Sequence, residues 1–324
     1  MKIQGAQIKI QGWRFGVGLI SLFVVALSFA VFLGSEKLSF FELTSEQSAI
    51  LFDIRLPRIL LGATVGASLA VAGASLQSLL RNPLAEPYLL GVSNGAALGT
   101  MLAFIFFASN EFARPLMAFA GAGLATFAVY QMARSRAGMN VERLVLSGVI
   151  VTTFLSSILV LLTSLLDASK LRSFTFWLLG DLSQATKNGF YLTLLVAALG
   201  TIILSSQARA LNLMMIGERD AFDFGVEVGK TRLIVFATAA ALVGISVAAS
   251  GSVGYVGLIV PHLVRLTIGS DNRLVVPFSA IAGAIFVVSA DTIARVAIAP
   301  RELPVGAITA LVGAPLFIYL LRKS

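Results

Sequence analysis

Few residues of this chain have the types and spacing needed for chemistry, and its arginines are the most informative of them. Arg55 and Arg58 open one apolar run, while Arg295 and Arg301 stand near the end of another. A guanidinium group can hold a carboxylate through two parallel hydrogen bonds. On the topology derived below these arginines face outward, so one interpretation is a surface that binds carboxylates. The other is ordinary snorkelling of long side chains at helix ends, and spacing alone leaves both open.

Asp291 is the only acid inside a predicted apolar helix core. It precedes Arg295 by four residues, so the two side chains can pair on one helix face. Ionisable groups inside a membrane often mark ion pathways, which would suit a self-sufficient secondary transporter or channel. Glu86 is the only other candidate for such a site. A local structural pair between Asp291 and Arg295 is the favoured interpretation.

No arrangement in the sequence predicts catalysis, a metal site or bound nucleotide. The chain has no cysteine and only one histidine, His262, so neither thiol chemistry nor a histidine-rich metal site is expected. Residues 225–231 resemble a phosphate-binding loop. However, Phe224 stands where its first glycine should be, and no buried strand precedes it. We therefore expect this chain to bind no cofactor and no ATP.

Composition predicts an all-α, polytopic membrane protein. Of 324 residues, 57% are hydrophobic and only 12% are charged, and the mean hydropathy is +0.92. About a quarter of the residues in soluble domains are charged. The net charge of +8 suits cytoplasmic loops rather than nucleic-acid binding. No long polar linker appears, so we expect one transmembrane domain over residues 1–324.

The central predicted element spans residues 59–80, which carry no charge and many Gly and Ala residues. Such a segment is long enough to cross a bilayer, and its small residues should let neighbouring helices approach closely. About ten membrane helices are expected in all, with both termini in the cytoplasm, which leaves most of the 24 Lys and Arg residues inside. Their predicted ranges are 15–33, 59–80, 92–107, 115–132, 144–166, 190–204, 233–249, a short one ending near 268, 274–297 and 305–321.

Two segments outside these helices also carry expectations. Residues 205–232 are polar but contain Met, Leu and Phe residues, which predicts short helices that present apolar side chains to a partner at the inner surface. The outer segment 167–188 holds Phe174, Phe176 and Trp177, which are interpreted as an interfacial aromatic belt. Residues 35–53 are expected to form an acidic, polar outer loop.

Nearly the whole chain resembles the FecCD family of permease subunits of ABC importers for iron-siderophores, haem and cobalamin. The motifs that carry the resemblance occur in order. They are Arg-Leu-Pro-Arg at 55–58, Asn-Pro-Leu-Ala-Glu-Pro at 82–87, Leu-Gly-Val-Ser-Asn-Gly at 90–95, Gly-Tyr-Val-Gly-Leu-Ile-Val-Pro-His at 254–262 and Glu-Leu-Pro-Val-Gly at 302–306.

The resemblance implies a type II ABC importer permease fold in a bacterial inner membrane. It further implies a homodimer, two cytoplasmic ATPase subunits that hold ATP and Mg²⁺, and a periplasmic or tethered binding protein. Iron(III)-siderophore is the first expected cargo, with cobalamin and haem as alternatives. The implied site residues are Arg55, Arg58 and Arg295 for docking of the binding protein, Gly217, Glu218, Ala221 and Gly225 for ATPase coupling, and Asn82 and Leu84 at the cytoplasmic gate.

Overall fold

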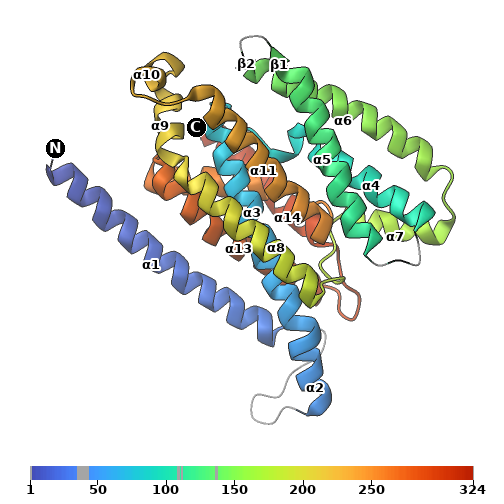
Figure 1. Ribbon diagram of the computed structural model, residues 1–324. Coiled ribbons are helices and arrows are strands. Elements are labelled where there is room, and N and C mark those ends of the chain that lie inside the picture. The colour runs from blue at the N-terminus through green and yellow to red at the C-terminus, as the bar shows by residue number, and fades with distance from the viewer. Residues whose placement is uncertain (1, 35–43, 108–109, 111, 136–137, 324) are drawn as a thin grey trace.

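The computed structural model describes residues 2–34, 44–107, 110, 112–135 and 138–323. These residues form an elongated bundle of helices with one short antiparallel pair of strands (Figure 1). The elements are α1 (Lys2–Phe32), α2 (Ser45–Ala49), the π-helical η1 (Ile50–Arg55), α3 (Leu56–Leu79), the 3-10 helix η2 (Pro87–Leu90), α4 (Val92–Phe106), α5 (Ala113–Ala133), β1 (Arg134–Ser135), β2 (Gly138–Met139), α6 (Val141–Thr163), α7 (Ala168–Leu178), α8 (Lys187–Ser206), α9 (Ala208–Ile216), α10 (Glu218–Asp223), α11 (Val228–Ser250), α12 (Val256–Ile268), α13 (Asn272–Val296) and α14 (Val305–Lys323).

The predicted all-α fold with about ten membrane helices is confirmed. Within the described residues, seven helical segments are long and apolar enough to span a membrane, and three shorter apolar helices accompany them. The shorter ones are Val92–Phe106, Val256–Ile268 and Val305–Leu320. Each of these segments overlaps one predicted range. The first, Arg14–Phe32, agrees with the predicted range 15–33, although α1 itself begins at Lys2. The second differs most, since it begins at Ser45 rather than at residue 59.

Helix α3 is the centre of the bundle, as its small residues predict. It packs against α13, α11, α12 and α8. In the most apolar stretch of the helical segment Ser45–Leu79, 89% of the residues are buried. A Cβ atom at Gly66 would collide with the backbone carbonyl of Gly283 on α13, and one at Gly283 would collide with that of Gly66. The two backbones are therefore in direct contact, which only glycine permits at this crossing.

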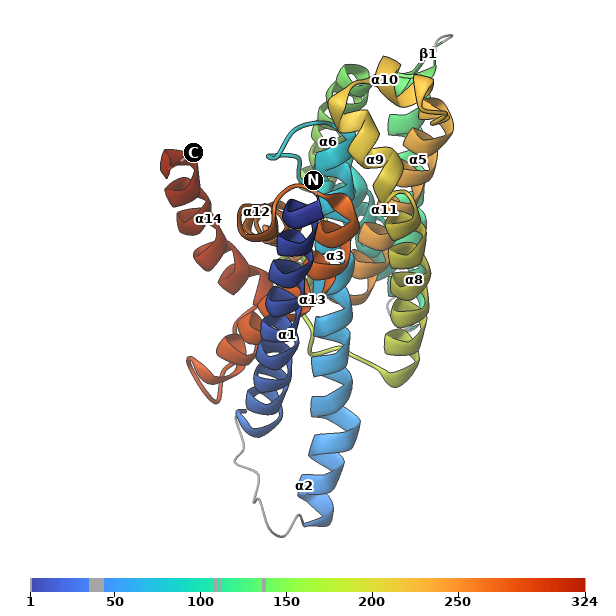
Figure 2. The same cartoon turned by 90° about the vertical axis from the view of Figure 1, so that its left-hand side faces the viewer.

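The expectation of an outer loop over residues 35–53 is wrong from Ser45 onward, and residues 35–43 lie outside the described part. Thr44 caps α2 through a capping box with Gln47, and the π-helical η1 then joins α2 to α3. The cap satisfies backbone donors that would otherwise need water. As a result α2, η1 and α3 follow one another without a break, and the α2 end projects from the bundle (Figure 2).

The outer segment predicted over residues 167–188 contains a helix, α7, which Asp167 caps by accepting a hydrogen bond from the backbone N–H of Lys170. Phe174 faces inward from α7 and is buried against Phe104 of α4 and the indole of Trp177. Phe174 therefore belongs to the core. Its inward position does not fit the interpretation of this residue as part of an aromatic belt.

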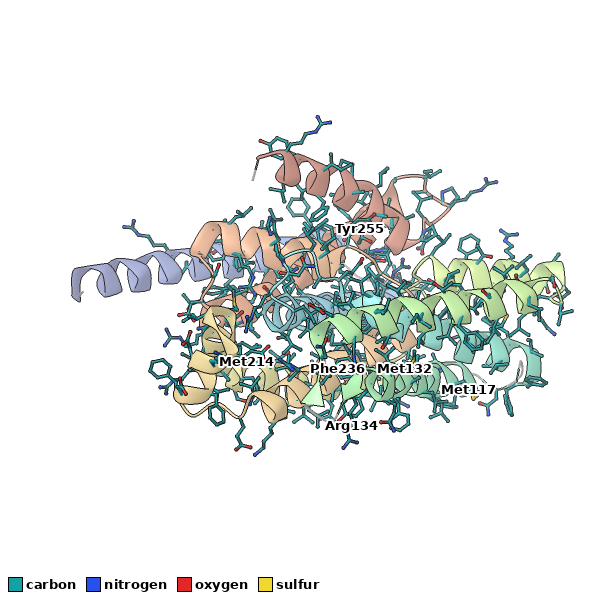
Figure 3. All side chains as sticks on the ribbon, turned by 90° about the horizontal axis from the view of Figure 1, so that it is seen from above. Met117, Met132, Arg134, Met214, Phe236 and Tyr255 are labelled. Atoms are coloured by element: carbon teal, nitrogen blue, oxygen red, sulfur yellow. The ribbon has the colours of Figure 1, made fainter. Side chains whose placement is uncertain are left out.

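Helix α14 stands apart from the other helices at the edge of the molecule (Figure 2). It contacts α13 and α12, and Tyr255, labelled in Figure 3, lies where α12 approaches it. Apolar side chains on its free face, including Leu311 and Ile318, are largely exposed. The chain alone leaves this face uncovered.

Candidate functional site

A buried network of charges joins α3 to α13 at the α2 end of the bundle. The guanidinium group of Arg58 donates to both carboxylate oxygens of Asp291, with Nη2 2.9 Å from Oδ1 and Nε 3.1 Å from each oxygen. Asp291 also forms the expected ion pair with Arg295, whose Nε lies 3.2 Å from Oδ2. That N–H is not aligned for a hydrogen bond. Asp291 is thus held between two arginines, and its predicted pairing with Arg295 is confirmed.

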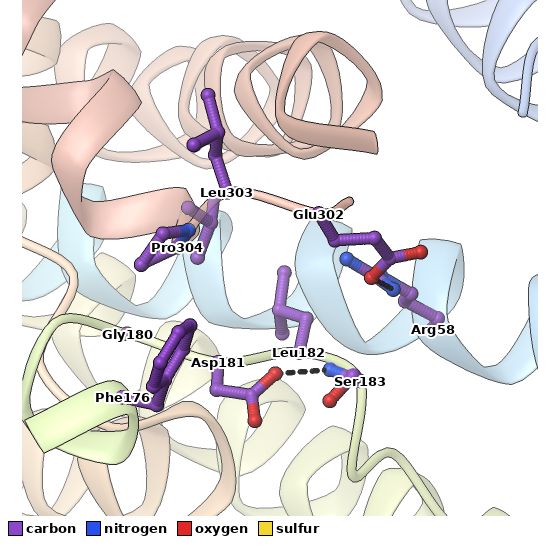
Figure 4. Close-up of a pocket in the computed structure, with 10 residues that line it drawn as sticks. Arg58, Phe176, Gly180, Asp181, Leu182, Ser183, Glu302, Leu303 and Pro304 are labelled. Carbon is purple, nitrogen blue, oxygen red and sulfur yellow. Dashed lines mark hydrogen bonds and ion pairs between the residues drawn. The ribbon is translucent and has the colours of Figure 1, made fainter. Parts of the chain in front are cut away.

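Glu302 completes this network from the segment before α14. Its Oε2 accepts a hydrogen bond from Nη1 of Arg58 at 2.6 Å. The two side chains lie at the edge of a pocket of about 150 Å³ that is also lined by Asp181 and Phe176 (Figure 4). The side chain of Glu302 is 38% exposed whereas that of Arg58 is 9% exposed. The carboxylate of Glu302 therefore separates Arg58 from the surroundings.

The three arginines expected to dock a binding protein are all buried in the chain. Besides the contacts above, Arg55 donates from Nη1 to the backbone carbonyl of Val31 at 2.8 Å, and Arg295 donates from Nη2 to that of Ala30 at 3.1 Å. These two hydrogen bonds tie the end of α1 to η1 and α13. The arginines thus have a structural role that spacing did not reveal, and their docking role stays a prediction.

The opposite end of the bundle carries the short helices expected within residues 205–232. Helices α9 and α10 lie outside the long helices at this end (Figure 1). Leu211 and Met214 of α9 are buried (Met214 is labelled in Figure 3). In contrast, Ile216, Phe222 and Phe224 are 74%, 71% and 74% exposed. The predicted exposure of apolar side chains in this segment is confirmed, and these three residues were not among the predicted coupling residues.

The four predicted coupling residues have different surroundings. Ala221, within α10, is fully buried. Glu218 is half exposed and accepts a hydrogen bond from Nη2 of Arg232 at 2.6 Å, which ties α10 to α11. Gly217 is the residue just before α10 and has an extended backbone. Gly225 has a φ of +81°, a backbone conformation that residues other than glycine adopt only at an energetic cost. These residues shape the α9–α10 pair, while Ile216, Phe222 and Phe224 form its exposed surface.

The two predicted gate residues lie in a tight turn after α3. Oδ1 of Asn82 accepts a hydrogen bond from the backbone N–H of Leu84 at 2.9 Å, which is an Asx turn. Arg81 precedes it with a φ of +50° and lies 3.8 Å from Glu218 of α10. Leu84 is 43% exposed. The turn is thus next to the α9–α10 pair, and its role as a gate stays a prediction.

Among the described residues, no three His, Cys, Asp or Glu side chains come together in a way that could hold a metal ion. His262 is partly exposed on α12. In the same described part of the chain, the hydrogen bonds between side chains join guanidinium and ammonium groups to carboxylates, and amides to hydroxyls and carboxylates. The arrangement is suited to helix packing and partner contacts.

Comparison with known proteins agrees with this geometry. The profile of the FecCD transport family matches residues 19–323. The chain is 42% identical over 285 residues to the cobalamin import system permease protein BtuC of Halobacterium salinarum, covering 87% of this chain and 76% of the relative. It is 40% identical over 323 residues to the hemin transport system permease protein HmuU of Yersinia pestis, covering 95% of each chain.

A solved structure described as an inward-facing metal-chelate type ABC transporter has the same fold. The TM-score is 0.87 at 33% identity, and the match covers 95% of this chain and 98% of that one. The expected type II importer permease fold is therefore confirmed, and the protein crosses the membrane several times. On this fold and on the family match over residues 19–323, the chain belongs to the FecCD transport family.

Proposed function

We propose that this chain is the transmembrane permease of an ABC importer that moves a bulky metal chelate into the cytoplasm, using ATP hydrolysed by a partner subunit. The observation that carries the proposal is the likeness over 95% of the chain to a metal-chelate type ABC transporter, with a TM-score of 0.87. The chain itself holds no ATP and performs no catalysis. ATP and Mg²⁺ bind to the partner.

The α9–α10 pair is the seat for the ATPase in this proposal. Ile216, Phe222 and Phe224 are exposed there beside polar residues of the same loop. Exposed apolar side chains with a polar rim are typical of protein interfaces. The α9–α10 end and both termini then face the cytoplasm of a bacterial inner membrane, and the α2 end faces outward.

The outward end receives the binding protein. Arg55, Arg58 and Arg295 place three positive charges close together at this end, where Asp291 pairs with Arg58 and Arg295, and Glu302 pairs with Arg58. An acidic surface on the binding protein would complement the cluster, and Glu302 would have to release Arg58 as the two proteins meet. In this proposal two copies of the chain form a homodimer with two ATPase subunits, and α14, which stands at the edge of the molecule with Leu311 and Ile318 exposed, packs against the second copy.

The first cargo to test is an iron(III)-siderophore, with cobalamin and haem as alternatives. Relatives at 36% to 42% identity carry names that refer to cobalamin, hemin, iron(3+)-hydroxamate and Fe(3+)-citrate. These cargoes share a chelated metal, and they differ in size, charge and shape. The residues that select among them would line a path between two copies of the chain.

The experiment is uptake into proteoliposomes that contain this chain, its candidate ATPase and its candidate binding protein. A ferric hydroxamate, cyanocobalamin and haemin are offered in parallel. The proposal expects ATP-dependent uptake of one of them, and loss of that uptake when Phe222→Ser disturbs the proposed seat. A matched control is Phe154→Ser, since Phe154 is a similarly exposed phenylalanine on α6, outside the α9–α10 pair. Uptake that Phe222→Ser leaves unchanged would contradict the assigned seat.

A further inference from the structure

A second polar network lies at the α9–α10 end, and its centre is the buried Asn272. Asn272 is fully inaccessible and is the first residue of α13. Its side-chain oxygen accepts hydrogen bonds from Oγ of Ser78 at 2.7 Å and from Nη2 of Arg265 at 3.0 Å. Its side-chain and backbone N–H groups both donate to Oδ1 of Asn212, each at 2.9 Å. One amide thus joins residues from α3, α12 and α9.

Asn212 connects this centre to α9, one of the two helices that carry the exposed apolar surface. Its own amide donates to Oδ1 of Asp271 at 2.7 Å. The Arg273 side chain, which donates to the same carboxylate, lowers the pKa of Asp271 to about 2. The carboxylate therefore stays charged at any cytoplasmic pH, and Asn212 has a constant acceptor. Both hydrogen-bonding groups of the Asn212 amide are used in fixing α9 to the start of α13.

Ser78 and Arg265 extend the network into the core. Arg265 of α12 donates from Nη2 to Oγ of Ser78 at 2.7 Å and to the backbone carbonyl of Ala74 at 3.0 Å. Both acceptors belong to α3, the helix at the centre of the bundle. The ends of α3, α12 and α13 are therefore joined through polar side chains, and not through apolar packing alone.

The directional character of these contacts gives the network mechanical consequences. Apolar contacts, such as those of the α9 side chains Leu211 and Met214, allow one helix to slide past another because they have no preferred angle. Buried hydrogen bonds require fixed distances and angles, and breaking one leaves a buried polar group without a partner. Displacement of α9 therefore either carries α3, α12 and α13 along or breaks several buried hydrogen bonds at once.

We propose that Asn212, Asn272, Ser78 and Arg265 form a coupling link that transmits movement of α9 to the membrane helices α3, α12 and α13. This inference rests on the proposed function, in which the ATPase seats on α9 and α10. The four residues act as positioning residues and touch neither nucleotide nor cargo. Without the link, the ATPase moves α9 while the helices around α3 stay behind, so ATP is hydrolysed without transport.

The test measures uptake and ATP hydrolysis together in proteoliposomes with the ATPase, the binding protein and whichever of ferric hydroxamate, cyanocobalamin or haemin the wild-type chain transports. For Asn272→Ala we expect hydrolysis to stay near the wild-type rate while cargo moved per ATP falls about tenfold, a typical size for coupling between sites. Asn212→Ala should do the same. Because Asn212 is partly exposed, this variant removes the link without opening a buried cavity.

The serines of α3 provide a matched control. Ser75 and Ser78 are both buried, and the hydroxyl of Ser75 donates to the backbone carbonyl of Val71 in its own helix at 2.9 Å. The single hydroxyl proton of Ser78 has two acceptors within reach, Oδ1 of Asn272 at 2.7 Å and the backbone carbonyl of Ala74 at 3.0 Å, and Asn272 is the nearer. Ser78→Ala should lower the cargo moved per ATP, whereas Ser75→Ala should not. The double variant Asn212→Ala with Asn272→Ala should be no worse than either single variant, because both remove the same link.

Two results would overturn the coupling link. One is an Asn212→Ala variant in which uptake and hydrolysis both keep their wild-type rates, and the other is a proportional fall of both rates, which indicates a structural role only. Failure of the proposed function has a different signature. In that case the wild-type chain itself shows no uptake that depends on the ATPase, whichever probe is offered.

Discussion

Arg58 and Asp291 form a bidentate ion pair that joins α3 to α13 across 233 residues of sequence. Both side chains are almost inaccessible, so the pair has lost its hydration and must be compensated within the protein. Arg295 and Glu302 supply that compensation, since each contributes the opposite charge to one member of the pair. The network therefore fixes how the two helices meet at the outward end.

Replacement of Asp291 by Asn should destabilise the protein strongly. The change leaves Arg58 and Arg295 buried without their shared counter-charge, and removal of one partner from a buried ion pair typically costs about 3–5 kcal/mol. Thermal unfolding in detergent measures the effect. The control is Asp53→Asn, which removes the exposed ion pair with Lys187 and should have a much smaller effect, because exposed ion pairs add little stability. Equal effects of the two variants would show that the buried network adds no stability.

Only part of this network could be predicted from the sequence. Asp291 and Arg295 are four residues apart in one helix, so the helical repeat brings them to one face. Arg58 and Glu302 come from distant segments, and nothing in their spacing indicates that they meet. The same limit explains why the arginines were expected to be open for docking. Their burial depends on α1 and on the segment before α14, which no local pattern describes.

Replacement of Glu302 by Gln should strengthen docking of the binding protein. Glu302 neutralises Arg58 and, in the proposed function, competes with an incoming carboxylate for it. Removing that competition should lower the dissociation constant about two- to fivefold, the range for a partly exposed ion pair. Surface plasmon resonance at low and high salt measures it. Glu142→Gln, which changes an exposed glutamate at the start of α6, serves as the control and should have no effect on binding. Weaker binding by the Glu302→Gln variant would contradict the competition between the two carboxylates.

Replacement of Gly225 by Ala should destabilise the connection between α10 and α11. Its φ of +81° is costly for a residue with a Cβ, by about 1 kcal/mol or more. The space around Gly225 is open, so a steric clash cannot account for the loss. Gly229→Ala is the matched control, because Gly229 is equally open but helical. There alanine should be neutral or stabilising. Unfolding temperatures of the two variants give the comparison, and a loss at both positions would argue against the conformational explanation.

Replacement of Asp271 by Asn should lower the free energy of unfolding by an amount that does not vary between pH 5 and pH 8. The pKa of Asp271 is lowered to about 2, chiefly by hydrogen bonds from the Arg273 side chain. A carboxylate with a lowered pKa stabilises the fold fully above its unfolded pKa of about 3.9, and this stabilisation is lost as the pH falls through the folded value. The stability difference between wild type and Asp271→Asn should therefore be constant down to pH 5 and shrink below pH 4. A difference that changes between pH 5 and 8 would be incompatible with the lowered pKa.

The fold was more predictable from the sequence than its connections were. Hydropathy located the membrane helices because each must be apolar along its length. It missed α2 and α7, because a polar cap at Thr44 or Asp167 starts a helix that hydropathy cannot detect. It also missed Asn272, whose importance arises only when α3, α9 and α12 meet around it.

The central claim is that a separate ATPase drives transport through this chain, and its most direct test is a comparison of three vesicle preparations. One contains this chain alone, the second adds the ATPase and binding protein without ATP, and the third adds ATP. The account predicts accumulation of one metal chelate above its outside concentration only in the third. Accumulation by this chain alone, driven by an ion gradient, would contradict it and would identify a secondary transporter.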